Sequence, residues 1–443
     1  MSEARLPWFT FVLGAGQRYW PGAEAAVAPL PVPAEPPGRL DNAFTTVPLP
    51  PWAADLMPGK HAGLLVDTAR LVDGEGPSWT RCQWWNAVFD LLTGMHERRV
   101  EARRGPLHSY ALRLSGLEGR LFDRAWVNRI FLFLRRWAAR EAGADEARLF
   151  GPLPAGRVHL THDVDAVRKT PVIRAKQSVF HTLNAGRAMV ANHPVRAAAR
   201  LSRAFRFSLG PGDFWRIPEL CRMEAEHNVR SSFHFYAGAT GGRPVPWQRR
   251  LFDPSYDLAH NDLSGALRAL HQDGWAVGLH PGHAAWADAG RLGEERRRLE
   301  AVSEMPVTTV RQHWLRFSWE HTWAAQAAAG LRTDFTLGFN DRPGFRAGAA
   351  LAWTPWMEDG TQAPVVVPTL FMDSHFYDYH PMTAEERRTA MGRWLDEVAA
   401  VRGEAAVLWH QRVLAPDYGW GEGYADLLRA LAARGLETVP RPR

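Results

Sequence analysis

The sequence predicts an α/β protein built on a distorted (β/α)7-type barrel, with a smaller, mainly helical or mixed domain at the amino terminus. Three observations indicate this class. From residue 157 onward, short β-branched runs alternate with amphipathic helical segments, which is the order typical of a parallel sheet. No glycine-rich dinucleotide loop follows the first run, so a closed or partly closed barrel fits better than an open sheet. Polar side chains gather where the runs end, which is where barrels place their chemistry.

The barrel is expected over residues 157–440, with seven strands and helices between most of them. The strands are predicted at Val158–Thr161, Val229–Tyr236, Trp275–His280, Thr308–Phe317, Arg332–Phe339, Pro364–Phe371 and Ala405–His410. The helices are predicted at Phe214–His227, Leu263–Gln272, Leu292–Glu304, Thr322–Ala329 and Ala384–Val401. The last helix follows a capping box, Thr383-Ala-Glu-Glu386, and ends before Gly403.

Residues 1–150 are predicted to form the amino-terminal accessory domain. Its start, up to about residue 60, is rich in proline and is expected to be extended or looping. The segment from Trp79 to about Ala142 has helical periodicity, with one apolar face made by Trp126, Ile130, Phe131, Leu134 and Trp137. A glycine- and proline-rich linker, 151–156, then leads into the first barrel strand.

The composition favours an intracellular globular protein. The two cysteines, Cys82 and Cys221, lie far apart and in no metal-ligand spacing, so reduced thiols are expected. The amino terminus lacks a signal-peptide pattern, and no stretch approaches the length of a membrane span. We therefore expect a cytoplasmic protein, with a peripheral position on the inner face of the membrane as a further possibility.

Residues 166–212 have an unusual charge and are predicted to form a basic helical insertion. The segment contains nine arginines and lysines and no aspartate or glutamate. Such a surface suits anionic lipid headgroups or a phosphate-linked glycan, and a solvated helix face explains it equally well. No nucleic-acid-binding motif accompanies the charge, so we do not expect DNA or RNA to bind.

Asp163 and Asp165 are the first candidate site residues. They follow the buried run Val158–Thr161 and would point the same way if the strand continued through Val164. Two carboxylates this close repel each other unless a cation or a shared proton offsets them, which suggests a metal ligand beside a general base. The alternative is a structural strand end that caps the next helix or pairs with a neighbouring cation.

Further polar residues lie at the predicted ends of other strands. They are His280 and His283 after the third strand, Arg311, His313 and Trp314 in the fourth, and Trp409 and His410 at the end of the seventh. A single buried histidine is more often structural than a ligand, but several on one rim of a barrel indicate a site. The 20 tryptophans add surfaces on which sugar rings stack, although most tryptophans belong to cores.

Taken in order, six short motifs of this sequence resemble those of the polysaccharide deacetylases, the chitooligosaccharide deacetylase homology domain of carbohydrate esterase family 4. The resemblance covers residues 157–440, and the preceding segment resembles the extra amino-terminal domain of one bacterial branch. The phrases are Thr161-His-Asp-Val-Asp165, Val229-Arg-Ser-Ser-Phe-His-Phe235, Val277-Gly-Leu-His-Pro281, Arg311-Gln-His-Trp-Leu-Arg316, Thr336-Leu-Gly-Phe-Asn-Asp341 with its continuation to Gly348, and Leu408-Trp-His410.

The resemblance implies a role for each matched residue. Asp163 would be the general base toward a metal-bound water, and Arg311 would hold that base. Asp165 and His280 would bind a divalent metal, typically zinc, and His410 would be the general acid. His313, Trp314 and Trp409 are the candidates for contact with a glycan or amino-sugar substrate.

The sequence departs from the family pattern at the metal site. The family has a second histidine four residues after the first, but that position is Ala284 here, and His283 stands three residues after His280. His283 is therefore only a doubtful third ligand. Two protein ligands are fewer than the three usual at catalytic zinc, so metal dependence is open at this stage.

The resemblance implies a hydrolase that removes acetyl groups from an N-acetylated sugar of a cell-surface or exopolysaccharide precursor. A first alternative is hydrolysis of a small cyclic amide or imide on the same barrel. A second is a catalytically degenerate barrel that binds a glycan or scaffolds an assembly. The displaced histidine favours this second alternative, while the retained Asp163, Arg311 and His410 oppose it.

Overall fold

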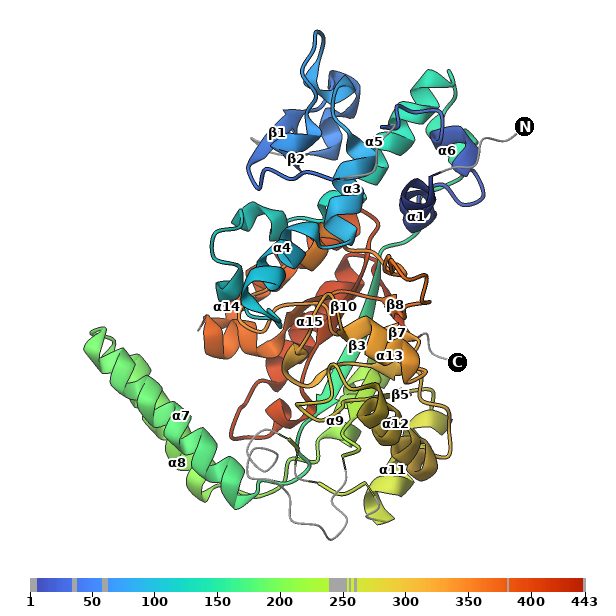
Figure 1. Ribbon diagram of the computed structural model, residues 1–443. Coiled ribbons are helices and arrows are strands. Elements are labelled where there is room, and N and C mark those ends of the chain that lie inside the picture. Colours follow the sequence, from blue (N-terminus) through green and yellow to red (C-terminus); the bar gives the residue numbers. More distant parts are fainter. Residues whose placement is uncertain are drawn as a thin grey trace.

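The computed structural model describes residues 6–33, 38–57, 63–238, 253–254, 256–258, 261–380 and 382–440. One parallel sheet curls through the centre of the carboxyl-terminal two thirds, and helices surround it (Figure 1). This is the α/β barrel that the sequence predicts, in a partly closed form.

The sheet has nine strands among the described residues. Eight run in the order β8-β7-β6-β5-β4-β3-β10-β9, and β11 pairs with the start of β3. All paired strands in it are parallel. The strands are β3 (Arg157–Val164), β4 (Ser232–Phe235), β5 (Ala276–Leu279), β6 (Thr309–Val310), β7 (Thr333–Asp334), β8 (Val365–Val366), β9 (Thr369–Met372), β10 (Glu404–Leu408) and β11 (Glu437–Val439).

Backbone hydrogen bonds hold the turn from β8 into β9, which joins the two edges of this curled sheet. The amides of Val367 and Thr369, which flank the turn from β8 into β9, donate to the carbonyls of Asp334 and Leu337 at 2.9 and 2.7 Å. The chain therefore returns from one edge of the sheet to the other within a few residues. This closure brings the carboxyl ends of the strands toward one opening.

The expected strands are present, but several are shorter than predicted. The run Thr308–Phe317 contains only the two-residue β6, because Trp314 and Leu315 adopt positive φ angles of 58° and 47° that end extended pairing. The run Pro364–Phe371 divides into β8 and β9. Strand β11 and the last helix lie beyond the predicted elements.

Helices cover the outside of the sheet. The five predicted helices are observed, with ends displaced by a few residues, and one more follows them. They are α9 (Ile217–Glu226), α11 (Asn261–Gln272), α12 (Ala289–Ser303), α13 (Thr322–Ala328), α14 (Ala384–Ala400) and α15 (Gly421–Ala433). Both halves of the predicted capping box at the start of α14 are formed.

The amino-terminal part is mixed in structure and lies at one end of the barrel (Figure 1). It contains α1 (Pro7–Ala15), α2 (Glu24–Val27), α3 (Trp84–Leu92), α4 (Met95–Arg104), α5 (Trp126–Glu141), α6 (Glu146–Phe150) and the antiparallel pair β1 (Phe44–Pro48) and β2 (Gly63–Asp67). The predicted apolar face of α5 is buried throughout. Part of the proline-rich start, residues 34–37, falls outside the described residues.

The basic segment forms two helices, α7 (Pro171–Val190) and α8 (Pro194–Leu209). They pack against each other as a hairpin that projects from the barrel (Figure 1). Where the structure describes the chain, no helix is both long and apolar enough to cross a membrane.

Candidate active site

A cleft of about 450 Å³ opens at the carboxyl ends of the barrel strands. Its walls come from β3, β5, β9 and β10, with one side chain, Tyr110, from the amino-terminal part and several from α7. The predicted Asp163, Asp165, His280, Trp314 and His410 all line it. The strand ends therefore converge as the barrel rule requires.

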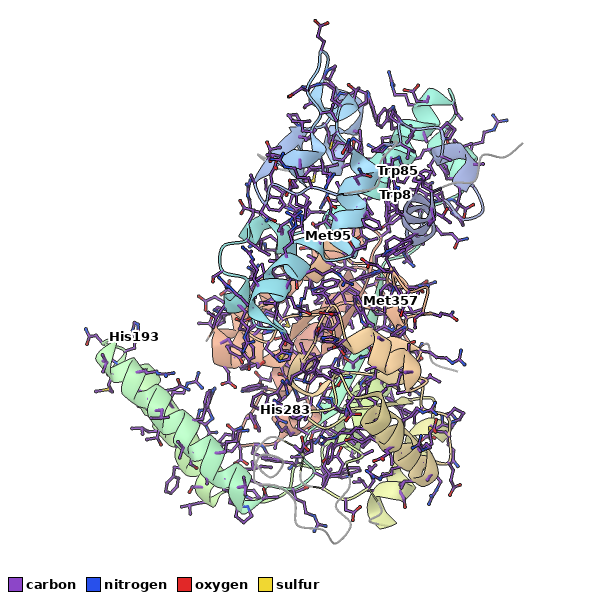
Figure 2. All side chains as sticks on the ribbon, in the orientation of Figure 1. Trp8, Trp85, Met95, His193, His283 and Met357 are labelled. Atoms are coloured by element: carbon purple, nitrogen blue, oxygen red, sulfur yellow. The ribbon has the colours of Figure 1, made fainter. Side chains whose placement is uncertain are left out.

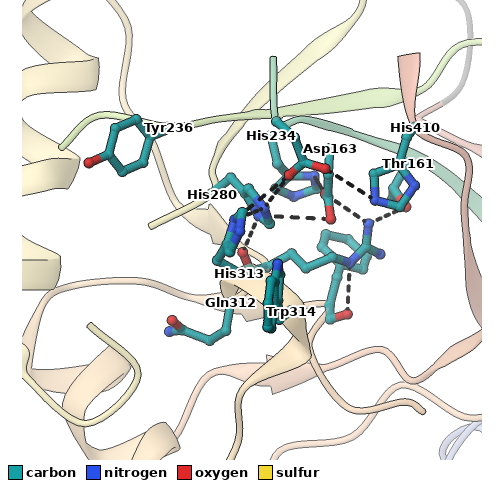
Figure 3. Close-up of polar contacts among 12 residues, drawn as sticks. Thr161, Asp163, His234, Tyr236, His280, Gln312, His313, Trp314 and His410 are labelled. Carbon is teal, nitrogen blue, oxygen red and sulfur yellow. Dashed lines mark hydrogen bonds and ion pairs between the residues drawn. The ribbon is translucent and has the colours of Figure 1, made fainter. Parts of the chain in front are cut away.

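Asp163 lies at the bottom of this cleft, near the end of β3. Its side chain is 4% exposed, and its Oδ1 lies 3.3 Å from Nη1 of Arg311 (Figure 3). Imidazoles approach both oxygens at 3.8 Å, His234 at Oδ1 and His280 at Oδ2. The carboxylate is thus enclosed by one guanidinium and two imidazole rings.

Arg311 is held rigidly as the partner of Asp163. It is fully buried, and its guanidinium also donates to the Phe335 carbonyl at 3.1 Å and to the hydroxyls of Thr161 and Thr369 at 2.6 and 3.1 Å. Every nitrogen of the guanidinium therefore has an acceptor, which fixes its direction. This is the position that the resemblance implies for it.

These surroundings keep Asp163 ionised. Burial alone raises the pKa of a carboxyl group, but His280, Arg311, His234 and His410 together lower the pKa of Asp163 below its ordinary value. The residue is a carboxylate at neutral pH and can accept a proton.

Asp165, His280 and His313 form a compact group that could hold a metal ion. One ligand atom from each lies within 4.8 Å of the other two. The Nε2 atom of His280 lies 3.2 Å from Asp165 Oδ1 and 2.8 Å from His313 Nδ1 (Figure 3). Two histidines and one carboxylate are a donor set found at catalytic zinc sites.

The tautomer of His280 suits a ligand. Its Nδ1 lies 2.8 Å from the carbonyl oxygen of Arg311, which only accepts, so this nitrogen carries the proton of the neutral ring. The Nε2 lone pair is left facing Asp165 and His313. Burial lowers the pKa of both His280 and His313, and neutral imidazole is the form that binds metals.

Asp165 offers the group one of its two oxygens. Its Oδ1 faces the histidines, whereas its Oδ2 accepts a hydrogen bond from the guanidinium of Arg412. The residues present fit a divalent cation with three protein ligands and a monodentate carboxylate. Sites of this kind leave a coordination position open for water or substrate.

The third residue of this group is His313, whereas the sequence suggested His283. His283 lies outside the group: its Nδ1 is 3.2 Å from Arg316 Nη1, and its backbone amide donates to Asp253. Burial and the nearby Arg316 lower its pKa to about 4. His313, expected to contact substrate, lies with Asp165 and His280 in the group that could hold a metal, because β5 and β6 are paired neighbours whose ends lie side by side.

His410 stands across the cleft and is paired with a carboxylate. Its Nδ1 lies 3.0 Å from both oxygens of Asp373, which also accepts the His410 backbone amide at 2.6 Å. Its Nε2 points toward Asp165 Oδ2 at 3.6 Å. Burial lowers the pKa of a histidine, but Asp373 outweighs it and raises the pKa of His410 above its ordinary value.

The two tryptophan predictions differ in outcome. Trp314 is 37% exposed and lines the cleft. Trp409 is 1% exposed and packs against Tyr377 and Tyr424, so the prediction that it contacts substrate is wrong. Neighbouring residues at the end of β10 alternate in direction, and Leu408 and His410 are the ones that face the cleft.

Three cleft residues were not predicted in these roles. Asp373 lies just after β9, so it follows the same barrel rule as Asp163. No sequence pattern marks Arg412, which lies in a short helical turn after β10 (Gln411–Leu414). Nor does one mark Tyr110, which comes from the amino-terminal part.

Comparisons with known proteins give distant structural likenesses. No family model and no curated protein matches the sequence. A Mycobacterium smegmatis protein assigned to the polysaccharide deacetylases is 18% identical, with a TM-score of 0.35, over 66% of this chain and 97% of that one. The Puue allantoinase is 13% identical, with a TM-score of 0.36, over 55% and 73%.

A pseudoenzyme of carbohydrate esterase family 4 from Bacillus anthracis is 11% identical, with a TM-score of 0.29, over 64% of this chain and 63% of that one. The solved structures that this chain is similar to thus include polysaccharide deacetylases, the family that its motifs resemble. The likeness is distant, and function is therefore inferred from the residues of the cleft.

Proposed function

We propose that this chain is a metal-dependent hydrolase that removes an acetyl group from an amino sugar. One observation carries the proposal: a single cleft is lined by an ionised carboxylate on a buried arginine, a carboxylate-paired histidine, and Asp165 and His280, which with the adjoining His313 could hold a metal ion. A simple binding surface needs neither the proton acceptor nor the proton donor.

A divalent metal, with zinc as the typical choice, would be held by Asp165, His280 and His313. When bound, it would supply Lewis acidity, lowering the pKa of water and polarising the acetyl carbonyl. Asp163 lies beside His280, with its Oδ2 3.8 Å from Nδ1, the ring nitrogen opposite the one that faces Asp165 and His313. It is placed to take the proton from the attacking water, and Arg311 keeps the carboxylate in position and ionised.

His410 is the proton donor on the other side. Asp373 favours its charged form and fixes the ring, so that Nε2 faces the cleft. Hydrolysis of an amide requires a proton on the leaving nitrogen, and a protonated histidine supplies it. Asp163 would thus accept the proton of the attacking water, and His410 would donate a proton to the leaving nitrogen.

The cleft walls support a sugar substrate. Tyr110, Phe180, Trp314 and Tyr379 contribute aromatic surface on which sugar rings can stack. We propose an N-acetylated unit of a cell-surface or exopolysaccharide precursor as the substrate class. We also propose a cytoplasmic location, which the two free cysteines, Cys82 and Cys221, support.

The test is acetate release from N-acetylated oligosaccharides by the purified protein supplied with zinc. We expect turnover by the native chain and a loss of about 10²-fold or more in Asp163→Asn, with substrate affinity retained. Activity on small cyclic imides alone would favour the other hydrolase. Glycan binding that is equal in both proteins, without turnover, would show a non-catalytic barrel.

A further inference from the structure

The hairpin of α7 and α8 is the part of the chain least explained by the barrel. Its far end, marked by His193, projects away from the body (Figure 2). It joins the barrel through Arg200, whose guanidinium lies 3.0 Å from Asp378, and through Phe207, which packs against Tyr418. Much of its surface has no contact with the rest of the described chain.

That surface carries most of the exposed apolar side chains of the molecule. Of the sixteen large apolar residues exposed in the described parts of the chain, ten belong to this hairpin. They are Val172, Val179, Phe180, Leu183, Met189, Val190, Val195, Leu201, Phe205 and Leu209. A helix pair that met only water would place polar residues at most of these positions.

The exposed apolar residues follow the helical period. On α7, Val172, Val179, Leu183 and Val190 are spaced by seven, four and seven residues, so they fall on one side at about 3.6 residues per turn. On α8, Leu201, Phe205 and Leu209 are each four apart. Exposure reaches 92% at Val190, next to the turn. Each helix therefore presents an unpartnered apolar stripe.

The charge of the hairpin indicates what covers these stripes. Residues 166–212 carry nine cations and no acidic residue, whereas the whole chain has a net charge of +6, so the rest of the chain is net negative. A second copy of the hairpin would bring like charges together. An anionic bilayer instead accepts apolar side chains at its surface and pairs its headgroups with arginine and lysine.

The hairpin also borders the catalytic cleft. Gln177, Phe180, Asn184 and Arg187 of α7 line the same hollow as Asp163 and His410. Phe180 and Asn184 come directly after the stripe residues Val179 and Leu183. Consecutive residues are about a quarter turn apart around a helix, so the cleft side of α7 adjoins the stripe. A membrane lying on the stripe would therefore run beside the opening of the cleft.

We propose that the α7–α8 hairpin docks the protein on an anionic membrane surface, beside the cleft opening. Apolar residues of the two stripes enter the boundary between headgroups and acyl chains, and exposed cations such as Arg187 and Arg206 meet the lipid phosphates, whereas Lys169 and Arg200 are paired with Asp417 and Asp378. If the proposed function holds, the substrate class is an amino sugar carried on a membrane lipid, since such a glycan would reach the cleft from the bilayer.

The test is co-sedimentation with vesicles of phosphatidylcholine alone and of phosphatidylcholine mixed with phosphatidylglycerol. We expect binding to the anionic vesicles only, weakening as salt is added. The variant V179D/L183D/V190D should bind at least about tenfold more weakly, because it places charges where apolar side chains enter the membrane. The matched control, V72D/L112D, changes exposed apolar residues outside the hairpin and should bind like the native chain.

Circular dichroism of each variant shows whether the helices remain formed. Absence of binding to anionic vesicles at low salt would overturn the proposal, as would equal losses in the hairpin variant and its control. A native dimer that the hairpin variant converts to monomer would show that a second copy covers the stripes instead. The vesicle readout needs no catalysis, so its outcome is independent of the hydrolase assignment.

Discussion

At the scale of single residues, the site depends on carboxylates that set the state of their neighbours. Asp163 stays ionised because Arg311 and the imidazoles offset its burial. His410 is charged more readily because Asp373 accepts from its Nδ1. In the proposed function Asp163 is the proton acceptor and His410 the proton donor, and the partners of each residue favour the charge state that its role needs.

Replacing Asp373 by asparagine tests this division of roles. The change removes the negative charge that raises the pKa of His410, so the ring should lose its proton at lower pH. If His410 is the proton donor of the proposed function, the rate depends on its protonated form, and kcat/KM should fall as pH rises past the pKa of that residue. We expect a loss of about 10²-fold near neutral pH and an alkaline limb displaced to lower pH.

The pH profile of kcat/KM measures both effects. A merely structural role for Asp373 would lower activity evenly across the pH range. An unchanged alkaline limb in the variant would contradict the assignment of His410 as the acid.

The sequence indicated most of these residues but not how they combine. Asp163, Asp165, His280 and His410 could be predicted because each stands where a recognisable strand ends. His313 could not be predicted as a ligand, because it lies 33 residues after His280 in the sequence. Only the pairing of β5 with β6 brings its Nδ1 to 2.8 Å from the Nε2 of His280. The histidine that lies near His280 in the sequence is His283, and its side chain faces Arg316 instead of Asp165.

At the scale of elements, the regular barrel helices and the longer strands were predictable from periodicity. The stretch after β6 was not, because its fold depends on distant partners. The Trp314 carbonyl accepts from Ser109 and from Asn340, which holds the left-handed backbone at Trp314. Neither partner is near this residue in sequence, so no local pattern signals the turn.

The junction of α5 with α14 is a second element whose stability depends on distant contacts. Glu397 on α14 accepts from Arg129 of α5 at 2.7 and 2.6 Å, and both side chains are almost fully buried. Glu397→Ala would leave the buried guanidinium without its carboxylate. We expect a loss of about 3 kcal/mol in the free energy of unfolding.

Urea denaturation measures this loss, and the neighbouring residue supplies the control. Asp396 is 64% exposed and pairs with Arg434, so Asp396→Ala should cost no more than about 1 kcal/mol. Equal effects of the two substitutions would show that the buried pair does not hold the junction.

At the scale of the whole molecule, buried polar contacts join the amino-terminal part to the barrel. Glu97 of α4 binds Arg346 with a closest distance of 2.7 Å, and Glu101 accepts from the Ser318 hydroxyl at 2.5 Å. Both pairs are buried. Buried polar contacts therefore fix the amino-terminal part to the barrel.

Tyr110 extends this contribution to the cleft. It is half-buried in the wall, and the Asp341 carboxylate fixes its segment by accepting from the amides of Ala111 and Leu112. We expect Tyr110→Ala to raise KM by about tenfold with little change in kcat, because the ring would contact the bound sugar away from the reacting atoms.

Steady-state kinetics on an acetylated oligosaccharide would show this effect. Leu112→Ala, which alters an exposed side chain in the same segment, should leave KM unchanged. A fall in kcat alone for Tyr110→Ala would place the ring elsewhere than the substrate surface.

The ligand set of Asp165, His280 and His313 is proposed to hold a divalent metal. It is tested most directly by elemental analysis of the native protein, His313→Ala and His283→Ala after incubation with zinc and removal of the unbound ion. We predict nearly one metal per native chain, its loss in His313→Ala and its retention in His283→Ala. A native chain without metal, or a metal that survives in His313→Ala and disappears in His283→Ala, would contradict the claim.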